Sequence, residues 1–176
     1  MRLGEALALQ WGDIDWHGRF IEVRRNYVCG KITRPKNGKS RRVDMSQQLA
    51  EELHQLLTQR KTEKLQGKWA ELPEWVFCSQ VGRQLHSNNL RRRVFYPCLE
   101  KAGLRRVRIH DLRHTYASLL IQQGESLAYI RDQLGHHSIQ VTIDIYGHLV
   151  PGGNQAAVDR LDDAPNRNLS ATSSKG

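Results

Sequence analysis

The sequence predicts an α+β domain that is mainly helical, with a small antiparallel sheet near the N-terminus. Short segments of alternating apolar and polar residues gather between residues 20 and 44, as half-buried strands require. Apolar residues then recur at three- and four-residue spacing through most of the chain to residue 146, as in amphipathic helices. A length of 176 residues suits one domain of ordinary size.

The first part of the chain is expected to hold one helix, at residues 2–10, followed by the sheet. The pair Asn37-Gly38 is typical of the tight turn in a hairpin, which predicts that Lys36 lies on or beside such a turn. The strands are expected at residues 20–24, 31–33 and 41–44.

The middle of the chain is expected to be helical on both sides of a loop. Ser46 is a candidate N-cap for a helix at 47–63, and its apolar stripe would consist of Leu49, Leu53, Leu56 and Leu57. A loop at 64–73 and a short buried strand at 75–78 follow. Ser87 would cap a helical segment at 88–102, which Pro97 is expected to kink or break.

Three helices are expected in the last part of the domain. They cover residues 110–123 and 126–134, ending at Gly124 and Gly135, and a segment that Ser138 caps. The expected core stripe of the first consists of Leu112, Tyr116, Leu119 and Leu120. In the last, one face would consist of Ile139, Thr142, Ile143 and Tyr146. The predicted domain covers residues 1–150. Residues 151–176 form a C-terminal segment, with a short helix at 155–161 and a disordered tail.

The charge balance favours a polyanionic partner. Lys and Arg outnumber Asp and Glu by 27 to 18, which gives a net charge of +9. Nucleic acid is the first candidate and an acidic membrane surface the second. No apolar run approaches the roughly 18 residues of a membrane span, and no signal peptide is recognisable, so a cytoplasmic protein is expected. Cys29, Cys78 and Cys98 lack the spacing of a disulfide framework or zinc site and are expected to be small apolar residues.

The run His110-Asp111-Leu112-Arg113-His114 places three basic side chains on one helical face, because steps of three and four residues return to nearly the same direction. A solvated surface is one interpretation. Another is an imitation of the H-E-x-x-H zinc helix, but Asp111 is one methylene shorter than the required Glu, and Arg113 would put a cation beside the metal. We expect no metal and no cofactor.

Tyr146, taken alone, completes an apolar stripe and so favours a core position. However, His136 precedes it by ten residues, and the two belong to a compact unit that can hold an imidazole and a phenol beside one phosphate. A free phenol ionises near pH 10 and needs nearby cations or a base to attack at neutral pH. Metal-free attack on a phosphodiester would be served by a set of six: Arg2, Lys36, His110, Arg113, His136 and Tyr146.

Two further groups have both an ordinary and a functional interpretation. Arg2 and Glu5 form either a surface ion pair or a pair in which Glu5 orients a partly buried Arg2. The basic stretch at 31–42 is either a solvated hairpin or a ribbon that contacts DNA. The candidate DNA-binding residues are Arg34, Lys39, Arg41, Arg42, Arg91 and Arg92.

These motifs resemble, as an ordered set, the catalytic domain of tyrosine recombinases, the phage-type integrases. The resemblance covers Arg2 to Pro151 and rests on R-L-G-E-A-L-A-L-Q-W-G-D-I-D, the basic hairpin, H-D-L-R-H-T-Y-A-S and L-G-H-H-S-I-Q-V-T-I-D-I-Y-G-H-L. It implies that Arg2 and Arg113 clamp the scissile phosphate and that Tyr146 attacks it to give a 3′-phosphotyrosyl intermediate. His110 would be the acid–base residue beside the nucleophile, and His136 would bind a non-bridging oxygen.

The resemblance further implies that Lys36 protonates the leaving 5′ oxygen, with Lys39 as a competitor, and that Glu5 and His114 support the site. The implied function is site-specific recombination of double-stranded DNA during integration or excision of a mobile element. Four protomers would assemble, each docking a C-terminal segment on a neighbour. The family's N-terminal DNA-clamping domain is absent, so we expect weak or no activity from this chain alone. Two alternatives stay open: supercoil relaxation, as in type IB topoisomerases, and a DNA-binding module without activity.

Overall fold

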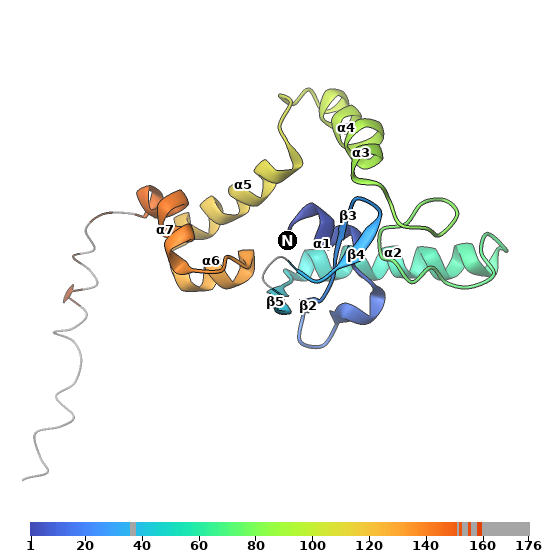
Figure 1. Cartoon of the computed structure of the whole chain (residues 1–176), viewed down its shortest axis with the longest axis horizontal. Coiled ribbons are helices and arrows are strands. Elements are labelled where there is room, and N and C mark those ends of the chain that lie inside the picture. The colour runs from blue at the N-terminus through green and yellow to red at the C-terminus, as the bar shows by residue number, and fades with distance from the viewer. Residues whose placement is uncertain (36–37, 151, 153–154, 156–157, 160–176) are drawn as a thin grey trace, which may run out of the picture.

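The computed structural model describes residues 1–35, 38–150, 152, 155 and 158–159 (Figure 1). The helices are α1 (Leu3–Leu7), α2 (Gln47–Leu65), α3 (Ser87–Leu90), α4 (Tyr96–Lys101), α5 (Ile109–Gln122), α6 (Leu127–Leu134) and α7 (Ile139–Tyr146). The strands are β1 (Ile14–Asp15), β2 (Phe20–Val23), β3 (Asn26–Val28), β4 (Lys31–Thr33) and β5 (Arg41–Asp44). The prediction of a mainly helical α+β domain is confirmed.

The strands form two small antiparallel sheets rather than one. The first has the order β1-β2-β5, and the second pairs β3 with β4. The strands on either side of the predicted turn, β4 and β5, are not paired with each other, because β4 pairs back onto β3 and β5 pairs with β2. Asn37 lies outside the described residues. The sequence analysis missed β1 and β3, which have only two and three residues.

The longest helix, α2, begins as predicted, since the Ser46 hydroxyl accepts a hydrogen bond from the Leu49 amide (3.2 Å). Its buried side is formed by Ala50 and Leu53, which join the core of the first sheet, whereas Leu49 is exposed. The predicted strand at 75–78 is wrong: only isolated bridges, from Trp75 to Gln10 and from Cys78 to Gln84, occur there.

Pro97 does not break its helical segment. The chain continues from α3 through a π-helical turn at Arg91–Phe95 into α4, where Pro97 lies in the first turn. The π-helical turn directly before α4 is the local distortion of this segment, and such a turn is one way in which a continuous helix accommodates a residue without an N–H. The predicted cap is also corrected, since His86 rather than Ser87 occupies the N-cap position.

Helices α5, α6 and α7 pack into a separate group (Figure 1). The predicted core stripe of α5 is mostly wrong, because Leu112 and Leu119 are half exposed, and the buried residues are Arg113, Ala117 and Ile121. Of the predicted stripe, Leu120 is partly buried and packs against the core. Ala117 is fully buried in a core cluster with Ile130 and Leu134 of α6 and Tyr146 of α7. The buried stripe is thus rotated by one residue, which turns Arg113 inward. On α7, likewise, Thr142 and Tyr146 are buried whereas Ile139 and Ile143 are exposed. The cap at Ser138 is confirmed by position only, because its side chain makes no capping hydrogen bond.

The helical group is joined to the first sheet between α6 and β5. The Gln133 side chain accepts from the Asp44 amide (3.0 Å) and donates to the Asp44 carboxylate (3.0 Å), which also accepts from the Tyr129 hydroxyl (2.8 Å). These bonds fix the C-terminal end of α6 against the strand that carries Arg41. None of the helices in the described parts of the chain has the length and apolarity needed to cross a membrane.

Some sequence predictions fall on residues that the structure does not describe. Lys36 lies outside the described residues, as do most of the helix expected at 155–161 and the tail beyond it. Of the cysteines, Cys78 is buried, whereas Cys29 and Cys98 are exposed, so the apolar role fits only Cys78.

Candidate active site

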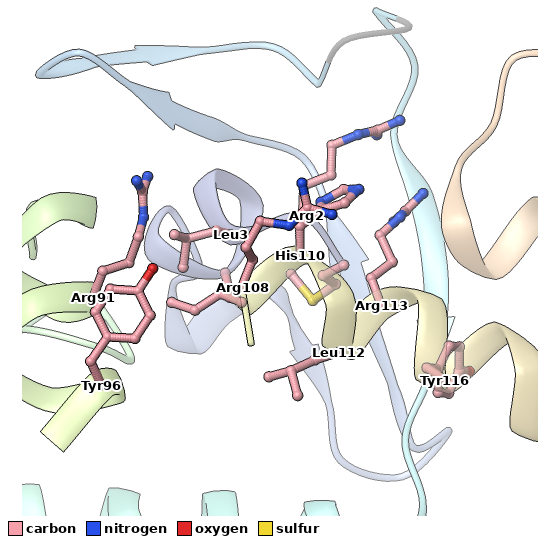
Figure 2. Close-up of a pocket in the computed structure, with 12 residues that line it drawn as sticks. Arg2, Leu3, Arg91, Tyr96, Arg108, His110, Leu112, Arg113 and Tyr116 are labelled. Carbon is pink, nitrogen blue, oxygen red and sulfur yellow. The ribbon is translucent and has the colours of Figure 1, made fainter. Parts of the chain in front are cut away.

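Two arginines that are far apart in the sequence, Arg2 and Arg113, meet at the C-terminal end of α6. Arg2 Nη2 donates to the carbonyl oxygen of Gly135 (3.3 Å), and Arg113 Nη2 donates to the carbonyl oxygen of Leu134. In Figure 2, both guanidinium groups point to the same side of an open pocket that His110 also lines. Arg113 Nη1 is buried without a hydrogen-bond partner among the described residues, so one edge of its guanidinium is left for an anion.

Burial lowers the pKa of Arg113 to about 10, and the nearby Arg2 guanidinium acts in the same direction. The side chain therefore stays cationic at neutral pH. Its 7% exposure means that little water screens its charge, which strengthens its attraction for an anion.

Glu5 is a fully buried carboxylate that holds two of the arginines. It accepts from Arg2 Nη1 (3.1 Å), from Arg41 Nη2 (2.7 Å) and from the Arg2 backbone amide (2.7 Å). Burial by itself raises the pKa of Glu5, but the hydrogen bonds and charge of Arg41, with those of Arg2, outweigh it and hold the pKa at about 2. This geometry supports the interpretation that Glu5 orients Arg2. Gly4 allows α1 to lie this close to β3, because a Cβ on residue 4 would be only 2.7 Å from the Tyr27 carbonyl oxygen.

Arg41 has a position that the sequence analysis did not predict. We expected it among the DNA contacts of the basic hairpin, but its guanidinium is paired with Glu5 and largely covered. It also lies against Gly135, where a Cβ would come 2.5 Å from Arg41 Nε. Gly135 has φ +65°, a left-handed conformation that glycine adopts without strain. The glycine that ends α6 thus also makes room for Arg41.

Tyr146 lies at the end of α7 with its hydroxyl beside α5. Its oxygen is 2.7 Å from His114 Nδ1, and the side chain is almost fully buried, with 3% exposure. Burial raises the pKa of the phenol, while the charge of Arg113 acts in the opposite direction. The phenol is therefore neutral at physiological pH, and we assign it as the hydrogen-bond donor to His114.

His136 follows α6 and faces the same residues. Its ring is parallel to that of Tyr146, with 6.5 Å between centroids, and its Nδ1 is 3.0 Å from the Thr142 hydroxyl. Burial, and then the charges of Arg113 and Arg2, lower the pKa of His136 to about 4. We assign Thr142 as the donor to Nδ1 of the neutral ring, which leaves the hydrogen on Nε2 available to an acceptor. Sequence analysis missed this role of Thr142, which was predicted only as part of an apolar face.

The low pKa of His136 predicts an acid-dependent loss of stability. An unfolded His136 binds a proton near pH 6.5, whereas the folded one does so only near pH 4. The unfolded state therefore gains protons first as the pH falls, and the free energy of unfolding should decrease between about pH 6.5 and pH 4. Urea unfolding at several pH values should show a smaller decrease for His136→Gln than for the wild type. The exposed His148→Gln is the control and should keep the wild-type decrease.

His110 is exposed at the pocket, with its ring edge-on to His114 and 5.1 Å between centroids. Its pKa is lowered by partial burial and by the neighbouring His114 and Arg113. Asp111 does not face the two imidazoles as a third ligand would, because Arg108 binds it (2.8 Å). Within the described ranges, no three His, Cys, Asp or Glu side chains are close enough together to hold a metal ion.

The other predicted basic residues differ in their position. Lys39 and Arg42 line a hollow together with Arg2 and His136, and Arg34 lines another with Arg2 and Arg91. Arg92 lies apart from the site, beside Tyr96 and Arg106. Arg34, Lys39 and Arg92 are exposed, and Arg42 is exposed with its guanidinium 4.4 Å from the Phe20 ring centroid. Arg91 lines the pocket shown in Figure 2. The sequence analysis overlooked the exposed Arg105 and Arg106, which precede α5; the dense run of arginines between residues 105 and 108 was the available signal.

Residues 1–151 match the sequence profile of the phage integrase family. The chain is 34% identical to the ICEBs1 integrase of Bacillus subtilis (strain 168), in an alignment that covers 93% of this chain and 45% of that protein. It is 30% identical to a XerC-like tyrosine recombinase of Caldanaerobacter subterraneus subsp. tengcongensis, with 93% and 46% covered. The chain therefore spans about half the length of the curated relatives it matches.

Solved structures with the same fold include recombinases bound to DNA. The Tn1549 transposon integrase in complex with transposon right end DNA superimposes with a TM-score of 0.69 at 19% identity, covering 92% of this chain and 55% of that one. The XerH site-specific recombinase bound to a palindromic difH substrate, in a post-cleavage complex, gives 0.64 at 26% identity, covering 93% and 42%.

Proposed function

Because this chain belongs to the phage integrase family and has the catalytic-domain fold of tyrosine recombinases, we propose that it breaks and rejoins DNA strands during site-specific recombination. The ICEBs1 integrase, a transposon integrase and a phage integrase among the similar proteins support integration or excision of a mobile element as the biological setting. Since the proposed substrate is intracellular DNA, the proposed location is the cytoplasm.

One observation carries this proposal. Arg2 and Arg113, 111 positions apart in the sequence, reach adjacent carbonyl groups at the end of α6, and Arg113 keeps a buried N–H group without a partner among the described residues. A phosphodiester in this place would receive two cationic donors where negative charge develops during displacement at phosphorus. Tyr146 belongs to the same cluster through His114 and His136.

In the proposed reaction, the Tyr146 hydroxyl gives its proton to a neighbouring imidazole as its oxygen forms a bond to phosphorus, and the bond between phosphorus and the 5′ oxygen of the DNA breaks. Arg2 and Arg113 neutralise the non-bridging oxygens, and the neutral His136 donates Nε2–H to one of them. Lys36 protonates the leaving 5′ oxygen, and the exposed Lys39 is the alternative donor. The resulting 3′-phosphotyrosyl ester keeps the energy of the broken bond, so a 5′ hydroxyl of another strand can reverse the step without ATP.

We propose double-stranded DNA as the partner, contacted by Arg34, Lys39, Arg42, Arg91 and Arg92. Four protomers on two duplexes are proposed for recombination, with residues 155–161 docking on a neighbouring protomer. Support for this assembly comes from the family resemblance.

Covalent capture on DNA tests the proposed function. A pool of duplexes with a randomised centre and a nick downstream of it is incubated with the chain. After cleavage, the short strand with its 5′ hydroxyl diffuses away and traps the protein as an adduct that survives denaturation. Sequencing the captured DNA identifies the site. We expect an adduct from the wild type and none from Tyr146→Phe, which removes only the nucleophilic oxygen.

Other outcomes point to other functions. Salt-sensitive DNA binding without an adduct would support a binding module, for which the burial of Tyr146 in the free protein is a specific argument. If an adduct forms, a plasmid with two copies of the captured site distinguishes recombination from simple relaxation, because only recombination changes the sizes of the products.

A further inference from the structure

The contact between Tyr146 and His114 assigns the nucleophile a proton acceptor. The family resemblance gives His114 only a supporting role and names His110 as the acid–base residue. Nevertheless, the His114 ring nitrogen lies 2.7 Å from the Tyr146 oxygen, and among the described residues no hydrogen bond joins His110 to Tyr146.

We propose that His114 accepts the phenolic proton when Tyr146 attacks, an inference that rests on the proposed strand cleavage. The O–H bond of Tyr146 breaks as its oxygen bonds to phosphorus, and the proton moves to Nδ1 of the neutral imidazole. The bond from phosphorus to the 5′ oxygen breaks with its electron pair, and that oxygen takes a proton from the lysine. On rejoining, the imidazolium returns its proton to the phenol.

The geometry favours His114 over the other imidazoles. A general base has to lie about 2.6–3.2 Å from the proton donor, and His114 meets this requirement before DNA is bound. His136 uses its Nδ1 on Thr142 and presents its ring face to Tyr146. Because the tyrosine side chain is 3% exposed, bulk water is poorly placed to take the proton.

His110 then lies on a different side of the cluster from the proposed base. Its ring stands edge-on to His114 at 5.1 Å and lines the open pocket with Arg2 and Arg113, which brings it to the phosphate side of the cluster. His114 comes from the turn of α5 that also carries Arg113. A movement of α5 therefore shifts the proposed base and one phosphate-binding arginine together.

The same hydrogen bond has a competing interpretation, in which His114 only holds the Tyr146 phenol in its buried, inactive position. In that case replacing His114 should speed cleavage. A general base contributes about 100- to 10,000-fold to a rate, so the two interpretations predict changes in opposite directions.

The test compares adduct formation by the full chain on the captured site, with oxygen or sulfur as the 5′ leaving atom. Sulfur leaves without protonation, so it should rescue Lys36→Ala but not a variant that lacks the nucleophile's base. We expect His114→Ala and His114→Asn to be at least about 100-fold slower on both substrates, because the asparagine oxygen accepts a hydrogen bond but does not take up a proton. Thr115→Ala, an exposed neighbour, is the matched control and should react at the wild-type rate.

Three results would overturn the inference while leaving strand cleavage intact: a wild-type rate for His114→Asn, faster cleavage by either variant, or rescue of His114→Ala by sulfur. Absence of an adduct from the wild type would refute both proposals together. Nitrogen-15 NMR of the free protein supplies a check without DNA. The His114 Nδ1 signal should be that of a hydrogen-bond acceptor and should shift in Tyr146→Phe, and a protonated Nδ1 at neutral pH would contradict the assignment.

Discussion

Replacing Arg113 by Lys should slow covalent adduct formation by about 100- to 1,000-fold, the usual cost of losing one preorganised donor to a developing oxyanion. Two nitrogens of the Arg113 guanidinium have separate roles. Nη2 donates to the Leu134 carbonyl oxygen, and the buried Nη1, which has no partner in the described structure, is the proposed donor to the phosphate. A lysine ammonium is a single point charge and cannot occupy both positions with fixed geometry. Initial rates of adduct formation on the captured site measure the effect.

The matched control is Arg60→Lys. Arg60 is also a partly buried arginine, but it pairs with Glu63 and lies over the Trp69 ring in a separate cluster at the C-terminal half of α2. It should cleave DNA at the wild-type rate, and thermal unfolding should show that both variants are folded. Wild-type cleavage by Arg113→Lys would remove Arg113 from the proposed phosphate clamp.

Replacing Glu5 by Gln should destabilise the domain by about 3–5 kcal/mol, the range found when one partner of a buried ion pair is removed. The neutral amide would leave Arg2 and Arg41 facing each other without a compensating charge. Cleavage should fall as well, because Arg2 would lose the carboxylate that orients it. Denaturant unfolding measures the first effect, and adduct formation at a temperature where the variant is folded measures the second.

Glu63→Gln is the control for this prediction, because Glu63 also binds two cations, Arg60 and Lys68, but in a partly exposed position. It should change stability far less than Glu5→Gln does. The pH dependence gives an independent check. The pKa of Glu5 is about 2 when folded and 4.5 when unfolded, so its contribution to stability is present above pH 4.5 and is lost as the pH falls toward 2. Glu5→Gln should lack this loss, and an unchanged acid profile would contradict the assigned ion pairs.

Periodicity predicted the long helices and failed where tertiary packing chose between similar faces. Residues 47–63 and 126–134 were predicted as helices close to the observed bounds of α2 and α6, since local spacing and caps determine such elements. On α5, however, periodicity assigned Leu112 and Leu119 to the core, whereas the folded chain buries Ala117 and Ile121. The choice depended on the close approach of α6 and α7, which no local pattern contains.

The sequence by itself determined the family of this protein, through the residue types in its ordered motifs. It also supplied the groups that we propose to act on a phosphodiester, and its helical spacing places His110, Arg113 and His114 on one face of a helix. Only the tertiary structure decided which group meets which. Glu5 binds Arg41 as well as Arg2, and Tyr146 meets His114 rather than His110. These pairings join α1 to β5 and α5 to α7, and contacts between distant segments depend on how whole elements pack, which local sequence does not encode.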